Sequence, residues 1–405
     1  MTALDRPVDV LIAGAGPGGS AAAALLADAG LRVLVVDGAR FPRDKACSEY
    51  MSPAAVAVLA RLGVLGELDA VGARPSGTSV VTSRGGRLTG RFAGAGASLV
   101  RTTGLSVARR ILDDRLVQAA RAAGAEVREA ATVRDLLYDR GAVAGAVVSS
   151  ADGQVAAIRA RLTIGADGLR SIVARRLGPR RHGAPRRIAF VAHVADVQDL
   201  GDTTEMHVGP EGYVGLNQIG GGIANVALVV PRRVAALARG DAAGFFHRQL
   251  ERYPGVAGRV QRSAAVRDVM VTGPFAARAS RVVADGALLL GDAAEFFDPF
   301  TGEGIYHALR GAELAAATAM TALLHDGIPS RRALLPYAAA RRVEFAGHWA
   351  VERIIGWMMQ APALFDRAVR RIERHGLADR LIGVTGDLLP ARAVLSPGFL
   401  VRTLW

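Results

Sequence analysis

Three glycines near the N-terminus, Gly14, Gly16 and Gly19, stand in the spacing G-x-G-x-x-G, which suits chemistry on a phosphate-bearing ligand. In this spacing the first glycine permits a tight turn, the second lets the backbone approach a pyrophosphate, and the third lets a helix pack closely on a strand. The carboxylate of Asp37 follows at a distance that suits hydrogen bonds from ribose hydroxyls. The pattern predicts a dinucleotide site. The residues assigned to it are Gly14, Gly16, Pro17, Gly18, Gly19, Asp37 and Gly38.

Two strands and one helix must position these residues. The aliphatic run from Val8 to Ala13 is typical of a buried parallel strand, and the alanine-rich segment from Ser20 to Ala29 predicts a helix. Gly30 stands where a helix C-cap is expected, and a second strand, Arg32 to Val36, leads into Asp37. Because a helix N-terminus offers free N–H groups and the positive end of its dipole, we expect it to hold the phosphates. The alternative is a glycine-rich turn in an ordinary α/β protein.

The next informative stretch is ARFPRDKACSEYMSP, in which Pro42 and the neighbouring charges indicate a loop. Ser52 and Pro53 predict the start of a helix, as N-cap and first helical residue. Lys45 is the single lysine of the chain, so a compact ammonium group is suited to this position, although one remaining lysine also arises by chance. Cys47 is either a thiol near a redox centre or, as we expect, a small apolar filler.

The glycine pattern, the F-P-R-D-K-A-C segment and the Ser-Pro helix together resemble a family of FAD-dependent oxidoreductases. This superfamily includes geranylgeranyl reductases, flavin halogenases and aromatic hydroxylases of the group A flavoprotein monooxygenase type. The resemblance implies an α/β fold with a Rossmann-type FAD-binding domain on a parallel sheet, of the glutathione-reductase-like kind. It also implies an interleaved β-sheet substrate domain and C-terminal helices. In this family the loop that carries Arg43, Lys45, Ala46 and Cys47 covers the adenosine and ribityl side of FAD.

Two further motifs extend the resemblance along the chain. Residues 105 to 127 are similar to the family's Arg-x-x-x-Asp-x-x-Leu helix, with Arg109, Asp113 and Leu116 in register, and this match places Arg109 beside the flavin. The segment IGADGLRSIVARRLG resembles the Asp-Gly motif of flavin hydroxylases, in which Asp167 contacts FAD. The alternative for Asp167 is a strand-to-helix turn that uses Asp and Gly for turn geometry alone.

The segment DGALLLGDAAEFFDPFTGEGIYHAL carries the most specific match. A strand over Ala287 to Leu290 is expected to deliver Asp292 to the ribityl hydroxyls, and a loop is expected to lead into a helix near Ile305. The N–H groups and dipole of that helix would stabilise the negative charge of a reduced flavin. The residues assigned here are Gly291, Asp292, Pro299, Gly302, Glu303, Gly304 and Ile305.

These motifs divide the chain into interleaved parts. FAD-binding parts are expected at residues 1–75, 105–178 and 281–330, and substrate-domain parts at 76–104 and 179–280. A short-stranded meander is expected over Ala131 to Ile158. Residues 331–405 form a C-terminal helical region. Its stretch from Trp349 to Phe365 either lines the wall of an apolar pocket, caps the core or pairs two subunits, and core packing is the expected role.

Composition narrows the classes of protein that remain. The chain has 405 residues and a formal net charge of +13, but only one lysine against 49 arginines, as expected from a GC-rich genome. No basic run is interleaved with aromatic residues, so we expect no nucleic-acid partner; an anionic membrane or a carrier protein remains a possible contact. One cysteine excludes an intramolecular disulfide and a Cys-based zinc site, and no metal is expected. No signal segment is recognised, which predicts a cytoplasmic protein. The oligomeric state stays open.

The substrate domain leaves the reaction open. Halogenases of this family carry Trp-x-Trp-x-Ile-Pro and geranylgeranyl reductases carry Tyr-x-Trp-x-Phe-Pro where this chain has GYVGLNQ, Gly212 to Gln218. Halogenation is therefore not expected. The favoured hypothesis is a monooxygenase that uses FAD, NAD(P)H and O2 on a lipophilic, aromatic or polyketide-like metabolite. The alternatives are a reductase or dehydrogenase of carbon–carbon double bonds in an isoprenoid or tethered intermediate, and a non-catalytic flavin- or lipid-binding module. Weak candidates for a proton donor are Tyr213, His193 and His207.

Overall fold

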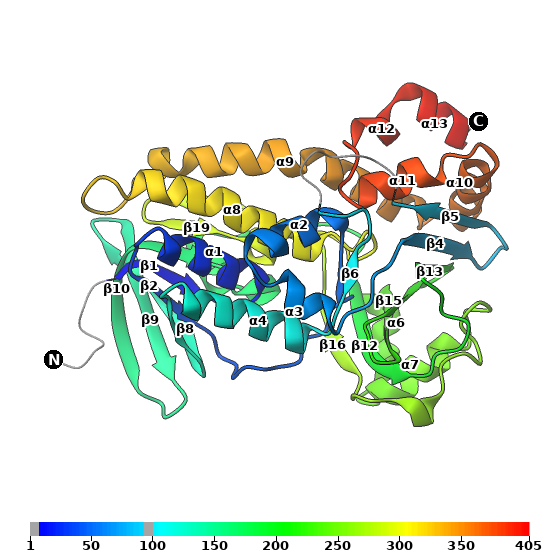
Figure 1. The fold of residues 1–405 in the computed structure, drawn as a ribbon, viewed down its shortest axis with the longest axis horizontal. Coiled ribbons are helices and arrows are strands. Elements are labelled where there is room, and N and C mark those ends of the chain that lie inside the picture. The colour runs from blue at the N-terminus through cyan, green and yellow to red at the C-terminus, as the bar shows by residue number, and fades with distance from the viewer. Residues whose placement is uncertain (1–7, 93–99, 405) are drawn as a thin grey trace.

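The computed structural model describes residues 8–92 and 100–404. It contains two main β-sheets that lie side by side along the long axis, with a layer of helices running over both (Figure 1). The N-terminal sheet lies at one end of the molecule and the second sheet at the other, while the C-terminal helices close the upper side of the view in Figure 1. None of the described helices is long and apolar enough to cross a bilayer.

The first sheet is built on parallel strands, and its order is β18-β19-β10-β1-β2-β7. Strands β7, β2, β1, β10 and β19 run parallel, and β18 pairs antiparallel with β19. A hairpin of β8 and β9 extends from β10. The strand bounds are β1 Val8–Ala13, β2 Val33–Val36, β7 Glu126–Arg128, β8 Ala131–Asp139, β9 Ala142–Ser150, β10 Val155–Gly165, β18 Val283–Ala284 and β19 Ala287–Leu289.

Alternate residues of these strands pack on two separate cores. Val10 and Ile12 of β1 face a core formed with helices, whereas Leu11 and Ala13 face the β8–β9 hairpin. Both faces are buried, which explains why the strands of this sheet read as continuous aliphatic runs. The helices that pack around this sheet are α1 Pro17–Asp28, α2 Pro53–Arg61, α3 Leu65–Asp69, α4 Arg109–Ala122, α5 Ile172–Leu177 and α8 Gly304–Ala322.

The second sheet has the order β16-β12-β15-β14-β13-β4-β5 and is mostly antiparallel. One face packs on α6 and α7, and the other faces the C-terminal helices. Its elements are β4 Gly77–Thr82, β5 Arg87–Arg91, β12 Arg187–Ala195, β13 Thr204–Gly209, β14 Gly212–Gln218, β15 Ile223–Pro231, β16 Met270–Thr272, α6 Arg232–Ala235 and α7 Ala242–Leu250. Two small sheets join the halves: β3 Tyr50–Met51 with β6 Leu105–Ser106, and β11 Arg180–His182 with β17 Ala277–Ala279 and β20 Glu295–Phe296.

The chain ends in five helices, which Figure 1 shows in orange and red: α9 Arg331–Met358, α10 Pro362–Arg374, α11 Ala378–Thr385, α12 Arg392–Leu395 and α13 Pro397–Leu404. Helix α9 runs along α8 toward the second sheet. Its distal half and the helices after it pack on that sheet through Val351, Met359 and Phe365. The C-terminal region therefore spans both halves of the molecule.

The predicted α/β class with a parallel sheet is confirmed, as is the helix start at Ser52, whose Oγ accepts a hydrogen bond from Ala55 N at 3.2 Å. Two details differ. The segment from Ala131 to Ile158 forms long strands rather than short ones, because Val133, Leu136, Val143 and Val148 cover the second face of the parallel sheet. The helix expected from residue 105 begins only at Arg109, after β6. The sequence also predicts glycine-broken strand character over Val80–Leu99; the end of β4 and the whole of β5 lie in this stretch, and its end, residues 93–99, lies outside the described residues.

Candidate FAD site and adjoining apolar cavity

Two cavities meet between the two halves of the molecule. The larger, of about 380 Å³, lies between the first sheet, the second sheet and the C-terminal helices. The smaller, of about 330 Å³, lies beside the ends of β1 and β2. Both are lined by Gly16, Lys45, Ala166, Asp167 and Arg170, so they adjoin at these residues, and we call the two together the channel. An elongated ligand can therefore run from the β1–β2 end to the second sheet.

The glycine turn shows which glycines the fold needs and which leave room for a ligand. Gly14 has φ +100°, and a Cβ at Gly19 would lie 1.9 Å from the Gly14 carbonyl oxygen, so the chain's own packing requires both glycines. A Cβ at Gly16 would meet nothing closer than Arg109 Nη2 at 3.9 Å. Gly16 has ordinary dihedral angles as the N-cap of α1, which has no side-chain cap and no acid in its first turn. The open space before these free N–H groups fits a pyrophosphate.

Asp37 lies at the end of β2 and lines the smaller cavity with Gly38 and Arg43. Its Oδ2 accepts a hydrogen bond from Ala15 N at 2.8 Å, and its Oδ1 accepts one from Ala39 N at 2.8 Å. Each carboxylate oxygen can accept more than one hydrogen bond, so capacity for ribose hydroxyls remains. These two backbone bonds also hold the carboxylate at the mouth of the glycine turn.

A buried ion cluster fixes the loop that carries Lys45 and Cys47. Asp113 accepts two hydrogen bonds from Arg109, through Nε and Nη2 at 2.7 Å each, and lies 2.7 Å from Arg43 Nη1. Burial alone would raise the pKa of Asp113, but these guanidinium groups hold the pKa below its usual value. Burial of the ammonium group and the positive charge of Arg109 lower the pKa of Lys45, while the negative charge of Asp292 acts to raise it. The cluster leaves Arg109 and Lys45 facing the larger cavity.

The same loop is also tied to the second sheet. His193 Nε2 lies 2.5 Å from Glu49 Oε2, and Asn225 Nδ2 donates a hydrogen bond to the Ser48 carbonyl at 3.0 Å. Because Glu49 and Ser48 directly follow Cys47, these contacts link the position of the loop to the strands that line the cavity.

Two carboxylates of the larger cavity have capacity for a ligand. Among the described residues no group donates a hydrogen bond to the carboxylate of Asp292. Burial raises the pKa of Asp292, although the positive charges of Lys45 and Arg109 act to lower it. Asp167 Oδ2 accepts from Ile172 N at 2.7 Å, while its Oδ1 is buried without a partner. Hydroxyl groups of a ribityl chain or ribose would satisfy these oxygens. Together with Gly16, these unpartnered oxygens show that the channel fits FAD.

The loop before α8 lines the larger cavity through Pro299, Gly302 and Gly304, followed by Ile305. Gly302 has φ +76°, which brings the backbone against the ring of Tyr50. The N-terminal end of α8, which starts at Gly304, thus lies at the cavity wall. Glu303 is the exception, because its side chain points away from the cavity into the protein.

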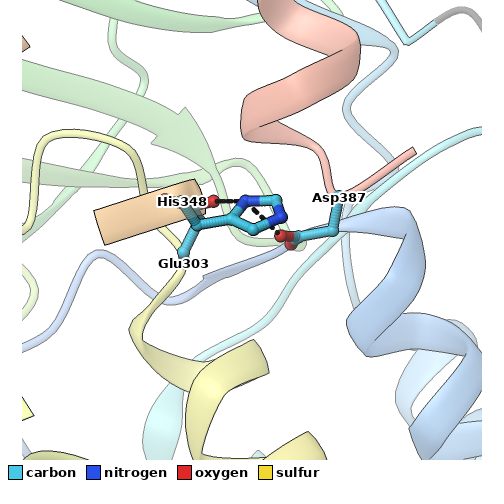
Figure 2. Close-up of side chains that lie close together, drawn as sticks. All are labelled: Glu303, His348 and Asp387. Atoms are coloured by element: carbon cyan, nitrogen blue, oxygen red, sulfur yellow. Dashed lines mark hydrogen bonds and ion pairs between the residues drawn. The ribbon is translucent and has the colours of Figure 1, made fainter. Parts of the chain in front are cut away.

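Glu303 meets two residues from the C-terminal region of the chain, and Figure 2 shows the three side chains converging. His348 Nδ1, on α9, lies 2.7 Å from Glu303 Oε1 and 3.3 Å from Asp387 Oδ1. Burial would lower the pKa of His348, but the hydrogen bond to Glu303 and the charge of Asp387 raise it to about 9. A positively charged His348 therefore links the loop before α8 to α9 and to the residue that follows α11.

This cluster predicts a pH-dependent stability. Since the pKa of His348 is higher in the folded chain than the ordinary 6.5, its contribution is complete below pH 6.5 and is lost as the pH rises through about 9. His348→Gln should lower the free energy of unfolding near pH 6 by about 1.5–3 kcal/mol, the range for a charge-assisted hydrogen bond.

Urea unfolding at pH 6 and pH 9.5 measures this effect. The exposed His375→Gln is the matched control and should leave both values unchanged. An equal loss at the two pH values for His348→Gln would contradict a role for the imidazolium charge.

The structure places the predicted cofactor residues as follows. Gly14, Asp37, Gly38 and Arg43 line the smaller cavity, Gly16, Lys45 and Asp167 line both, and Pro17, Gly18, Ala46, Cys47, Arg109, Gly291, Asp292, Pro299, Gly302, Gly304 and Ile305 line the larger one. Gly19 and Glu303 line neither. Gly19 serves the turn, and Glu303 serves the ion cluster.

Each of the three candidate proton donors is paired with a carboxylate of the protein. Tyr213 lines the larger cavity, but its hydroxyl donates to Asp298 Oδ1 at 2.7 Å, and burial and Asp298 raise its pKa well above the usual value. His193 is paired with Glu49, and His207 Nε2 lies 2.7 Å from Glu205 Oε2. Neither imidazole lines the cavity, so the structure does not place them beside a ligand there. Strand β12 is buried on both faces and gives no alternation from which the direction of His193 could be read.

Several residues that line the larger cavity were not assigned from the sequence, and Tyr50 is one of them. Tyr50 lines the larger cavity beside Gly302, and its ring stacks on Phe92 with centroids 6.3 Å apart. Burial, with the charges of Asp387 and Glu303, raises the pKa of Tyr50 well above its usual value, so its hydroxyl stays protonated. Tyr50 stands three residues after Cys47 in the same segment, and this position could have indicated that it lines the site.

Comparison with known proteins agrees with this geometry. The family model of the FAD binding domain matches residues 7–346. The chain therefore belongs to this FAD-binding family of oxidoreductases. It is 33% identical over 332 residues to a menaquinone reductase of Mycolicibacterium smegmatis, covering 77% of this chain and 76% of that protein. It is also 33% identical over 332 residues to digeranylgeranylglycerophospholipid reductase 2 of Methanopyrus kandleri, covering 78% of each.

Solved structures show the same fold. The FAD-dependent myxobacterial chondrochloren halogenase CndH superposes with a TM-score of 0.79 at 22% identity, covering 99% of this chain and 94% of that one. At this identity the likeness concerns the fold alone. The predicted Rossmann-type flavoprotein architecture is thereby confirmed.

Proposed function

We propose that this FAD-dependent oxidoreductase is a reductase that adds two hydrogen atoms across a carbon–carbon double bond of an isoprenoid lipid. The observation that carries the proposal is the apolar part of the larger cavity, beyond the glycine turn. It is lined by side chains of the second sheet, the loop before α8 and α11: Val80, Val191, Val229, Phe275, Phe300 and Leu381. The two reductases that share 33% identity with this chain support the same class. This proposal reverses the preference for a monooxygenase that the sequence alone favoured.

The cavity walls suit a prenyl chain better than a polar metabolite. Aliphatic and aromatic side chains exclude water and bind a flexible hydrocarbon through burial of apolar surface. When bound, FAD supplies the hydride for such a reduction. The reduction of FAD itself is assigned to NAD(P)H as the proposed electron donor.

The proton for such a reduction must come from a group on the cavity wall. Glu205 also lines the cavity. Burial raises the pKa of Glu205, but the contacts with His207 and Arg259 outweigh this and lower it to about 2, so the carboxylate stays ionised. Tyr50 lines the same cavity, and none of the described carboxylates accepts a hydrogen bond from its hydroxyl, unlike that of Tyr213. We therefore assign the proton to Tyr50, with the thiol of Cys47 as the neighbouring alternative on the same wall.

A monooxygenase remains the second candidate, because one feature of the cavity favours it. Gly215 stands in the β14 segment GYVGLNQ, where related reductases carry tryptophan, and lines the cavity without a side chain. A Cβ here would meet only the side chain of Met206, with Sδ at 3.4 Å, so the wall carries less bulk than a tryptophan would give it, which suits O2 and a ring-shaped substrate.

Product analysis separates the two reactions. The holoenzyme with NADPH or NADH is supplied with a menaquinone or a digeranylgeranyl phospholipid in detergent micelles, and the product is analysed by mass spectrometry. The reductase predicts a product whose prenyl chain has gained two hydrogen atoms, both with and without O2; fragment masses place the two hydrogens on the chain and not on the quinone ring. A product that gains an oxygen atom, formed only in air, would establish the monooxygenase instead.

Tyr50→Phe should lower the reduction rate by about tenfold to a hundredfold or more while FAD stays bound.

A further inference from the structure

The outward face of α9 carries a continuous apolar stripe. Seven residues spaced three or four apart lie on one side of this 28-residue helix, and this spacing places them on one face. We call them the α9 stripe: Leu335, Ala339, Val343, Ala346, Ala350, Ile354 and Trp357. The side chain of Val343 is 86% exposed and that of Trp357 is 66% exposed. The opposite face of α9, with Leu334, Tyr337 and Phe345, is buried on the core.

The α9 stripe is accompanied by positive charge only. Arg332 and Arg342 are exposed on α9 and have no ion pair among the described residues, whereas Arg341 and Arg353 of the same helix pair with Glu295. The two acids of α9 face other elements: Glu344 pairs with Arg310, and Glu352 is buried. An exposed apolar helix face with arginines beside it and no exposed acid is typical of a helix that lies in the interface of an anionic membrane.

The stripe is also adjacent to the larger cavity. Ile355 follows Ile354 directly, and its side chain lines the cavity from the inner side of the helix. The last turns of α9 thus separate the cavity from the stripe, and Figure 1 shows α9 on the outside of the molecule, above α8. A lipid leaving a membrane at this face would enter the cavity around the end of one helix.

We propose that the α9 stripe docks on an anionic lipid membrane, from which the isoprenoid substrate enters the cavity. The substrate part of this inference rests on the proposed reductase function, whereas the docking part rests on the surface alone. A second copy of the chain suits the stripe less well. A two-fold pairing of α9 would bring the arginines of both copies together, with no exposed acid on the helix to compensate them.

Vesicle flotation of the full-length holoprotein tests the docking. With vesicles of phosphatidylcholine and phosphatidylglycerol in equal parts, we expect the protein to float with the lipid, and with phosphatidylcholine alone we expect at least about tenfold weaker binding. The double variant Val343→Ser, Trp357→Ser should lose about tenfold or more in binding, because two large apolar side chains no longer enter the lipid. The matched control is Val155→Ser, on the distant β9–β10 hairpin, where Val155 is 65% exposed.

The outcomes separate docking from the reaction. Val343→Ser, Trp357→Ser should keep its FAD content and its rate on a detergent-solubilised prenyl lipid, and lose rate only when that lipid is in vesicles. Equal flotation of the variant and the parent would overturn the docking. A dimer would also overturn the docking. In that case light scattering would give the parent a molar mass of two chains and the double variant a molar mass of one chain. If the parent floats but reduces no prenyl lipid in either setting, the proposed function fails and the docking stands.

Discussion

Gly16→Val is expected to yield a folded protein that no longer retains FAD. Beyond its two chain neighbours, a Cβ at Gly16 would meet nothing closer than Arg109 Nη2 at 3.9 Å, and the backbone angles of Gly16 suit any residue. The free energy of unfolding of the apoprotein should therefore change by no more than about 0.5 kcal/mol. The valine side chain would fill the space before the α1 N-terminus, and FAD affinity should fall by at least about a hundredfold, or about 3 kcal/mol. Ultrafiltration followed by flavin absorbance in the retained protein measures this loss.

Gly19→Ala gives the contrasting result, because it acts on the fold and not on the ligand. Its Cβ would lie 1.9 Å from the Gly14 carbonyl oxygen, so the turn must distort even without FAD. We expect this variant to be destabilised as the apoprotein. If Gly16→Val bound FAD as tightly as the parent protein, the pyrophosphate could not lie at this turn.

Asp113→Ala is expected to cost about 3–5 kcal/mol of stability in the apoprotein, because removing one partner leaves uncompensated buried charge. Asp113 is fully buried and compensates both Arg109 and Arg43. The loop that holds Lys45 and Cys47 should lose its position at the same time. Addition of FAD should restore part of the stability, since its phosphates would offer the guanidinium groups a new anion.

Urea denaturation with and without FAD measures both effects. Asp114→Ala, at the adjacent and less buried position of α4, is the matched control and should change stability by less than about 0.5 kcal/mol. A loss below about 1 kcal/mol for Asp113→Ala would show that the cluster is not needed to hold Arg109 and Arg43.

The parts of the site that local geometry dictates could be predicted from the sequence. The turn through Gly14 and Gly19 follows from backbone sterics, and the helix starts at Ser52 and near Ile305 follow from capping and turn residues. The buried parallel strands followed from their aliphatic composition. These features involve residues close together in the sequence, where residue type alone restricts the conformation.

The parts that depend on long-range packing could not be predicted. Arg43 and Asp113 belong to different elements, and nothing near either residue indicates their pairing. Glu303 was assigned to the cofactor with its neighbours, but its side chain turns toward His348 and Asp387, which lie far along the chain, on α9 and in the turn after α11. The apolar spacing of α9 indicates a buried face, yet Val343 and Trp357 are exposed because the opposite face already contacts the core.

Anaerobic mixing of the reduced holoenzyme with a prenyl lipid tests the central claim most directly. The flavin absorbance is followed after the protein has been reduced with one equivalent of NADPH or dithionite and mixed in detergent with a digeranylgeranyl phospholipid, which carries no quinone that could oxidise the flavin. A reductase predicts that the oxidised flavin spectrum returns without O2, in proportion to the double bonds that are reduced, and more slowly in Tyr50→Phe. A flavin that stays reduced until O2 is admitted, with oxygen then appearing in the product, would contradict the assignment.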